Sequence, residues 1–218
     1  MKRILAIDTS HALCTVALTA DSLISSRSSA EPRQHARELL PMIQGLLDEH
    51  HISVRELDAF ALVIGPGSFT GLRIGAGVVQ GLSFATSVPV FCISSLAVMA
   101  MRAHFAHSGA MFNVCLQARE DEVYAASYAI QDDCPVLLGA ERVCKPEELR
   151  FEGPGVAVGD GWALCPALPD TQHLLIDCSS EAVALAAVAL AHARRGEKGV
   201  AASAVLPIYL KDQMGYQA

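Results

Sequence analysis

Hydrophobic and polar residues follow two different periods along the first half of the chain. Short apolar stretches separated by polar turns predict a meander of three strands, over residues 3–8, 12–19 and 23–29. An apolar stripe then recurs at helical spacing from Leu39 to Leu47. This stripe predicts an amphipathic helix over residues 34–49.

Strands and helices alternate after this first helix. The pattern predicts strands over 57–64 and 88–93, and helices over 71–86 and about 95–105. The second half opens in the same way as the first, and its predicted elements are strands over 111–118, 122–130, 135–143 and 156–158 and a helix over about 180–195.

Three antiparallel strands followed by alternating helices and strands favour an α/β fold with a mixed sheet of ribonuclease-H-like type. Because the order partly repeats, we expect two related lobes. The first is an N-terminal ribonuclease-H-like lobe over residues 1–106. The second is a C-terminal ribonuclease-H-like lobe with a C-terminal tail, over residues 107–218.

A glycine-dense run from Gly65 to Gly75 joins a predicted strand to a predicted helix. Helix N-termini expose N–H groups that favour anions, but a P-loop needs Lys after its last glycine, and Leu72 follows Gly71. A serine-hydrolase elbow needs glycine two positions before its serine, where this chain has proline. Ser68 is therefore better interpreted as a turn or N-cap residue. A ligand-binding role, a structural turn and a contact surface stay open.

The helix after this run contains an unusual number of glycines, at positions 71, 75, 77 and 81. Each interior glycine costs a helix about 1 kcal/mol relative to alanine. Glycines four residues apart share a helix face and let another backbone approach closely. The neighbour is either the sheet of this chain or a second subunit.

Composition narrows the class of protein. The chain has 218 residues, of which 52% are hydrophobic, and a mean hydropathy of +0.35, which is enough for a sizeable core. No apolar run reaches the roughly 18 residues of a membrane span, and the chain starts directly in a strand, so we expect a cytoplasmic protein without a membrane partner. Seven cysteines without a CxxC pair favour reduced, mostly buried thiols. A net charge of −7 argues against unaided nucleic-acid binding.

Candidate chemistry is sparse. Asp8 ends the first strand, where actin-like and sugar-kinase-like folds keep a carboxylate, but Asp before Thr-Ser is also an ordinary turn former. His104 and His107 share a helix face without a third ligand nearby. Arg119 lies in a charged run that is most simply a hairpin tip.

Five segments resemble, in order, the TsaB (YeaZ) family of bacteria. They are Ile4–Ser10, His35–Pro41, Gly65–Gly75, Gln117–Tyr124 and Pro207–Leu210. The resemblance implies an actin/Hsp70/sugar-kinase-type fold of two ribonuclease-H-like lobes. It also implies a role in making threonylcarbamoyladenosine beside the anticodon of tRNAs that read ANN codons.

The resemblance further implies a protein without catalytic residues, cofactor or metal. In the related transferase TsaD, two histidines hold a metal, and Ser95 and Met99 stand at the corresponding positions here. Serine and methionine cannot replace two imidazoles on such a metal. The implied role is a non-catalytic partner of TsaD, beside a TsaE-like ATPase and TsaC, with tRNA bound only through the complex. Gln117 and Lys211 depart from the usual family pattern, so no role is carried over to them.

The family also implies a pairing surface on the helices predicted over 34–49 and 71–86, used with TsaD or with a second copy in a homodimer. The interface residues expected on this basis are His35, Leu39, Leu40, Ile43, Leu46, Leu72, Gly75, Val78, Gly81 and Leu82. The alternative function is an independent ATP- or metal-dependent enzyme of the actin-like fold, which includes the older glycoprotease label. The first hairpin lacks the glycine of active kinases of this fold, so the resemblance does not imply that the isolated chain binds ATP.

Overall fold

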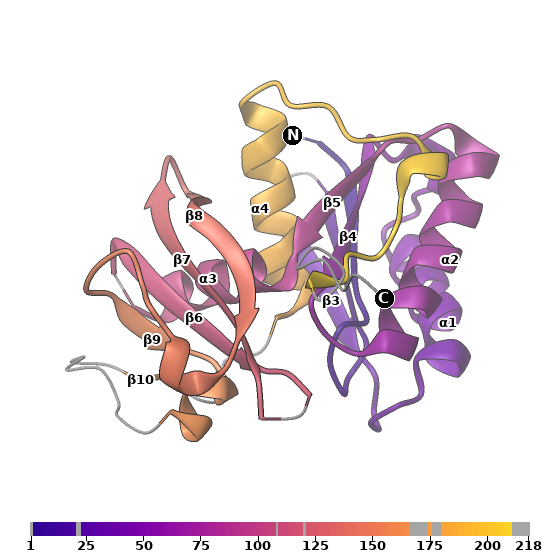
Figure 1. Cartoon of the computed structure of the whole chain (residues 1–218). Coiled ribbons are helices and arrows are strands. Elements are labelled where there is room, and N and C mark those ends of the chain that lie inside the picture. Colours follow the sequence, from indigo (N-terminus) through magenta and orange to yellow (C-terminus); the bar gives the residue numbers. More distant parts are fainter. Residues whose placement is uncertain are drawn as a thin grey trace. The chain divides into compact units, whose positions relative to one another are not determined.

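The computed structural model describes residues 2–20, 23–107, 109–119, 121–165 and 180–210, and the backbone of residues 174–175. Their contacts divide the chain into two compact units. One unit draws its residues from Met1–Ser95 and Ser180–Pro207, and the other from Leu96–Ser179 and Ile208–Ala218. Figure 1 shows the helices and strands, most of them labelled.

The first unit holds a five-stranded sheet in the order β3-β2-β1-β4-β5. β1, β2 and β3 pair antiparallel, whereas β1, β4 and β5 pair parallel. Its elements are β1 (Ile4–Asp8), β2 (Thr15–Ala20), β3 (Leu23–Ser28), α1 (His35–Glu49), the short helix η1 (Val54–Glu56), β4 (Ala59–Gly65), α2 (Phe69–Thr86), β5 (Val90–Ser94), α4 (Ala182–Arg194) and η4 (Ala202–Ala204).

The second unit repeats this sheet, since its order β10-β9-β6-β7-β8 is the same sequence of pairings taken from the other edge. β6, β7 and β8 pair antiparallel, and β6, β9 and β10 pair parallel. Its elements are α3 (Ser95–Ala106), which begins at the last residue of the first unit, β6 (Met111–Gln117), β7 (Val123–Gln131), β8 (Cys134–Cys144), η2 (Pro146–Glu148), β9 (Val156–Val158), η3 (Asp160–Leu164) and β10 (Leu174–Leu175). The repeated order confirms the predicted class of two ribonuclease-H-like sheets.

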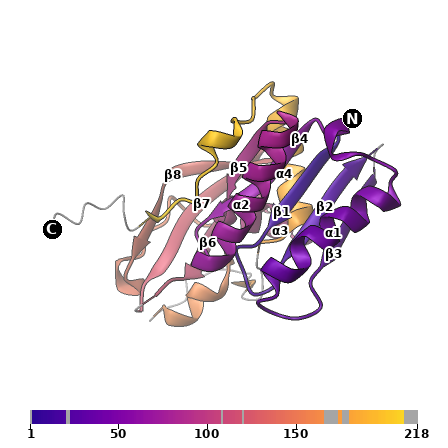
Figure 2. The same cartoon turned by 90° about the vertical axis from the view of Figure 1, so that its right-hand side faces the viewer.

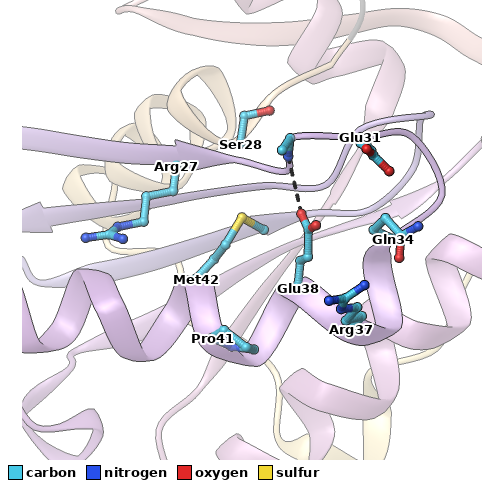
Figure 3. Close-up of a pocket in the computed structure, with 9 residues that line it drawn as sticks. Arg27, Ser28, Glu31, Gln34, Arg37, Glu38, Pro41 and Met42 are labelled. Carbon is cyan, nitrogen blue, oxygen red and sulfur yellow. Dashed lines mark hydrogen bonds between the residues drawn. The ribbon is translucent and has the colours of Figure 1, made fainter.

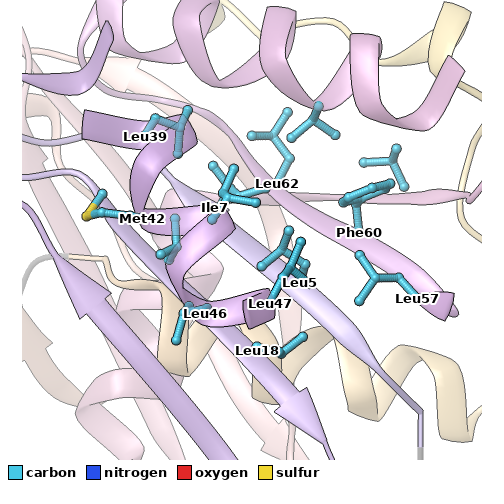
Figure 4. Packing of buried hydrophobic residues seen from close by; sticks show 14 of the residues in the cluster. Leu5, Ile7, Leu18, Leu39, Met42, Leu46, Leu47, Leu57, Phe60 and Leu62 are labelled. Carbon is cyan, nitrogen blue, oxygen red and sulfur yellow. The ribbon is translucent and has the colours of Figure 1, made fainter. Parts of the chain in front are cut away.

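The core of the first unit lies between its sheet and the helices α1 and α2, which lie side by side over one face (Figure 2). Side chains of a strand alternate between the two faces of a sheet. On β1, Leu5 and Ile7 therefore point to the same side, where they pack with Phe60, Leu62 and the apolar stripe of α1 (Figure 4). Burial of these side chains positions α2, and with it the glycine-dense turn.

Helix α4 covers the other face of the same sheet, where it packs against β1 and β2. Its alanine-rich sequence suits this position, because small side chains let the helix approach the sheet closely. The division of the chain into lobes 1–106 and 107–218 stays a prediction, and the contacts of α4 are those of the first unit.

Predicted element types agree with the structure along the chain, while several ends move by a few residues. The helix expected from residue 71 begins at Phe69, and the strand expected from residue 12 begins at Thr15. The short helix η3 over residues 160–164 was not predicted. Asp21, Ser22, Glu120 and Lys211 lie outside the described residues. None of the helices in the described ranges combines the length and apolar character needed to cross a membrane.

Candidate functional site

The turn before α2 is held by hydrogen bonds within the chain. Ser68 is the N-cap of α2, and its Oγ accepts a hydrogen bond from the Gly71 N–H at 3.2 Å, which confirms the predicted capping role. The Ser68 N–H donates to the Ser10 carbonyl oxygen at 2.7 Å. A donor that an anion would need at this helix end is therefore already used by the β1–β2 turn.

Three glycines of this segment face that turn. A Cβ atom on Gly67, whose φ is +155°, would lie 2.5 Å from the Ser10 carbonyl oxygen. A Cβ on Gly71 would lie 2.0 Å from the Thr9 carbonyl oxygen, and one on Gly75 would lie 2.3 Å from Thr9 Oγ1. No side chain fits at these separations. The sequence left open whether the glycines face the chain's own sheet or a second subunit, and these three face their own chain.

The other two glycines of α2 face away from the sheet. Gly77 and Gly81 are exposed, and a Cβ on either would meet no atom of the described residues within 4 Å. Phe84, three residues beyond Gly81, is 84% exposed. At the start of the helix, the Arg73 guanidinium carbon lies 3.3 Å from the centroid of the Phe69 ring, which is itself partly exposed. We call Phe69, Arg73, Gly77, Gly81 and Phe84 the α2 stripe, since residues three or four apart share a helix face.

The residues expected at a partner interface fall into two groups by their exposure to solvent. The buried ones are His35, Leu39, Ile43, Leu46, Leu72 and Gly75. Leu40, at 52% exposure, and Gly81 lie at the surface, and Val78 and Leu82 are half-buried. A partner can therefore touch the second group directly, whereas the first group shapes the helices from inside.

Asp8 is a buried carboxylate whose oxygens are occupied by neighbours. Its Oδ1 accepts hydrogen bonds from the Ser10 N–H at 2.8 Å and the Ser10 hydroxyl at 2.6 Å. Its Oδ2 accepts a hydrogen bond from the Ser180 hydroxyl, which lies just before α4. Buried charges are tolerated when they are hydrogen-bonded in this way. The carboxylate thus ties the start of α4 to the β1–β2 turn.

Removal of one of these donors should measurably destabilise the protein. We expect Ser180→Ala to lower the free energy of unfolding by about 2 kcal/mol, because a buried carboxylate loses a hydrogen bond. Urea unfolding followed by circular dichroism measures the change. The matched control is Ser203→Ala, at an exposed position, where we expect a change within about 0.5 kcal/mol. Equal stability of the two variants would contradict a structural role for Ser180.

The two positions that correspond to metal-binding histidines in the transferase have other contacts here. The buried Ser95 hydroxyl donates to the Pro66 carbonyl oxygen at 2.5 Å and so supports the glycine turn. Met99 is fully buried, and its methyl group lies 2.8 Å from where a Cβ on Gly159 would stand. Among the described residues no group of three or more His, Cys, Asp or Glu side chains is placed to hold a metal ion, the His104–His107 pair included.

A surface hollow of about 630 Å³ lies beside the start of α1 (Figure 3). Arg27 on its wall already donates to the Gly45 carbonyl oxygen at 3.2 Å and to Glu49 at 3.0 Å. The Glu38 carboxylate accepts from the Ala30 N–H at 3.3 Å. Because its two arginines and two glutamates balance in charge, the lining does not favour a phosphate group. The lining residues are Arg27, Ser28, Ala30, Glu31, Gln34, Arg37, Glu38, Pro41 and Met42.

The charged run after β6 forms the tip of the β6–β7 hairpin. The Glu122 N–H donates to the Arg119 carbonyl oxygen at 3.2 Å. The Gln117 N–H donates to Asp160 Oδ1 at 2.8 Å and so connects the hairpin to η3. These contacts agree with the interpretation of this run as a hairpin tip.

Three residues of this region were not predicted from the sequence: Arg73, Phe84 and Ser180. Helical spacing from the exposed glycines would have found the first two, since Arg73 lies four residues before Gly77 and Phe84 lies three after Gly81. Ser180 gave no local signal, because it is 172 residues from Asp8 in the sequence.

Comparison with known proteins adds independent information. The family model of TsaD, described as tRNA N6-adenosine threonylcarbamoyltransferase, matches residues 25–203. The tRNA threonylcarbamoyladenosine biosynthesis protein TsaB of Escherichia coli (strain K12) is 33% identical over an alignment of 229 positions, which covers 99% of this chain and 97% of that protein. The Haemophilus influenzae protein of the same name is 35% identical over 173 residues, or 73% and 72% of the two chains. The solved structure of YeaZ from Pseudomonas aeruginosa is 38% identical with a TM-score of 0.90, and the match covers 96% of this chain and 100% of that one.

Proposed function

Because the chain belongs to the TsaB family of tRNA threonylcarbamoyladenosine biosynthesis proteins, we propose that it is the non-catalytic partner of a TsaD-like transferase. In this role it pairs with the transferase and holds it in its active arrangement. The product is N6-threonylcarbamoyladenosine next to the anticodon of tRNAs that read ANN codons.

The exposed α2 stripe is the observation that carries this proposal. Within the described part of the chain, a side chain on either of two glycines would meet no neighbour, and Phe84 beyond them is 84% exposed. Together they form a smooth surface with an aromatic anchor. Exposed aromatic and arginine side chains are typical of the residues that dominate binding energy at interfaces. Leu40, Val78 and Leu82 add apolar area on α1 and α2.

The contacts of the candidate catalytic positions support a partner rather than an enzyme. Asp8 is engaged by Ser10 and Ser180, and the Ser95 hydroxyl is engaged by the glycine turn. Met99 offers a thioether, a ligand type that suits soft metals rather than a hard Lewis acid. The chemistry of the complex is accordingly assigned to the transferase.

Further partners follow from the same proposal. A TsaE-like ATPase completes the complex, and tRNA binds through the complex, because a chain of net charge −7 provides little attraction for a phosphate backbone. When the transferase is absent, a second copy of this chain binds the α2 stripe and forms a homodimer.

Reconstitution tests the proposed function. The TsaD-like transferase and TsaE-like ATPase of the same organism are incubated with tRNA and threonylcarbamoyl-adenylate, with and without this chain, and modified adenosine is quantified by mass spectrometry. We expect at least tenfold more product with the chain than without it. Equal yields would contradict the proposal.

Calorimetry on the isolated chain distinguishes the alternative of an independent enzyme. We expect no sub-millimolar binding of Mg-ATP and no turnover, because the Asp8 carboxylate is already hydrogen-bonded on both oxygens. Tight binding with hydrolysis by the chain alone would favour the enzyme over the partner.

A further inference from the structure

Three cysteines gather around Trp162 in the second unit. Cys115 is a fully buried member of the hydrophobic cluster that contains this tryptophan, and the half-buried Cys144 and Cys165 pack against it. All three are free thiols. They come from three different elements, since Cys115 lies on β6, Cys144 ends β8, and Cys165 caps η3.

The sulfurs of Cys115 and Cys165 lie against the same residue, Gly161. A Cβ on Gly161 would lie 2.7 Å from Cys115 Sγ, and Cys165 Sγ is 3.6 Å from the Gly161 carbonyl oxygen, to which it donates. Each of the two thiols also influences the pKa of the other. The two sulfurs therefore share Gly161 as a neighbour, with one inside the cluster and the other partly open to solvent.

We propose that Cys115 and Cys165 form a redox-modification site, at which a small disulfide such as oxidised glutathione converts the thiol pair into a Cys115–Cys165 disulfide. Cys165 reacts first because it is the accessible member. Cys115 then resolves the intermediate, since its sulfur and that of Cys165 both lie against Gly161.

The exchange proceeds in two balanced steps. The Cys165 thiolate attacks one sulfur of the small disulfide, whose S–S bond breaks and releases one small thiolate. The Cys115 thiolate then attacks the Cys165 sulfur, and the bond to the second small thiol breaks. The pair loses two electrons and two protons, and the small disulfide is reduced to two thiols.

Deprotonation limits the rate of this exchange. Burial raises the pKa of both thiols, and the hydrogen bond from Cys115 partly offsets this effect at Cys165. Below these raised pKa values the thiolate fraction grows about tenfold per pH unit. We therefore expect disulfide formation to accelerate from pH 7 to pH 8.5.

Peptide mapping of the intact chain tests the proposal. The protein is incubated with defined mixtures of reduced and oxidised glutathione, remaining thiols are alkylated after unfolding, and linked peptides are identified by mass spectrometry. We expect a linked peptide that contains Cys115 and Cys165, formed equally well in Cys144→Ser. Cys115→Ala should stop at a glutathione adduct on Cys165, and Cys165→Ser should form no link.

Other outcomes would overturn the proposal. A link that contains Cys144, or a wild-type protein that stops at the glutathione adduct, would exclude the Cys115–Cys165 pair. Melting curves of each variant show whether it is folded, and the Cys144→Ser result stands whether or not Cys115→Ala folds. Cys14 serves as an internal control, because its side chain is fully buried and closed to the small disulfide, so it should stay reduced.

Discussion

Gly71→Ala should unfold this protein more readily than any other single-methyl addition in α2. The new Cβ would stand 2.0 Å from the Thr9 carbonyl oxygen, a backbone atom that cannot turn aside as a side chain can. Either the helix or the β1–β2 turn must move, and overpacking of this kind costs about 1–3 kcal/mol or more. We expect a loss of about 3 kcal/mol in the free energy of unfolding, measured by urea denaturation.

Gly77→Ala is the matched control for this prediction. It adds the same methyl group to the same helix, at a position where a Cβ meets no atom within 4 Å. Alanine is favoured over glycine in a helix by about 1 kcal/mol, so this variant should be more stable than the natural protein. The two substitutions should thus have opposite signs. A stabilised Gly71→Ala variant would show that the turn does not pack against Thr9 as described.

The different surroundings of Gly71 and Gly77 illustrate what the sequence alone could and could not indicate about this helix. Residues four apart share a helix face, whereas residues two apart, such as Gly75 and Gly77, differ by about 200° around the axis. The sequence therefore contains enough information to say that the two glycine pairs face opposite sides. It does not say which pair faces the sheet, because the small side chains give only a weak apolar pattern around the helix.

Element types were predictable where continuous apolar runs or an apolar stripe at helical spacing marked them. β1 and β4 are buried along their whole length, and α1 has one apolar stripe. The packing of α4 on the first sheet was not predictable in this way. Its contact with β1 depends on residues far apart in the sequence, such as Ser180 and Asp8. The sequence around either residue does not indicate that the other is its partner.

The candidate site shows the same limit. Leu39, Ile43 and Leu46 were expected at a partner interface, but an apolar stripe on a helix marks the face that is buried first, and here that face covers the helix's own sheet. The residues left for a partner are those that interrupt this pattern, the exposed Leu40 and Phe84. Apolar residues that fall outside the main apolar stripe of a helix are thus the stronger sequence signal for an interface.

Gly81→Leu should weaken pairing with the TsaD-like transferase while it stabilises the isolated chain. The leucine has open space in this chain, and it replaces a poor helix former, so the free energy of unfolding should rise by about 0.5–1 kcal/mol. In the proposed complex the side chain fills the space that the partner backbone needs. We expect at least about tenfold weaker binding, or 1.4 kcal/mol, measured by isothermal titration calorimetry with the purified transferase.

Two further variants separate an interface from a general effect of leucine. Phe84→Ala should weaken binding by about 2 kcal/mol, because it removes the aromatic anchor of the α2 stripe. Arg194→Leu places leucine at an exposed position on α4, which covers the opposite face of the first sheet, and should bind as the natural protein does. If Gly81→Leu raised both the stability of the chain and its affinity for the transferase, the partner would bind elsewhere, because a leucine in the contact surface would then have done no harm. A gain in stability with a loss of affinity is the result that only a contact surface at this glycine explains.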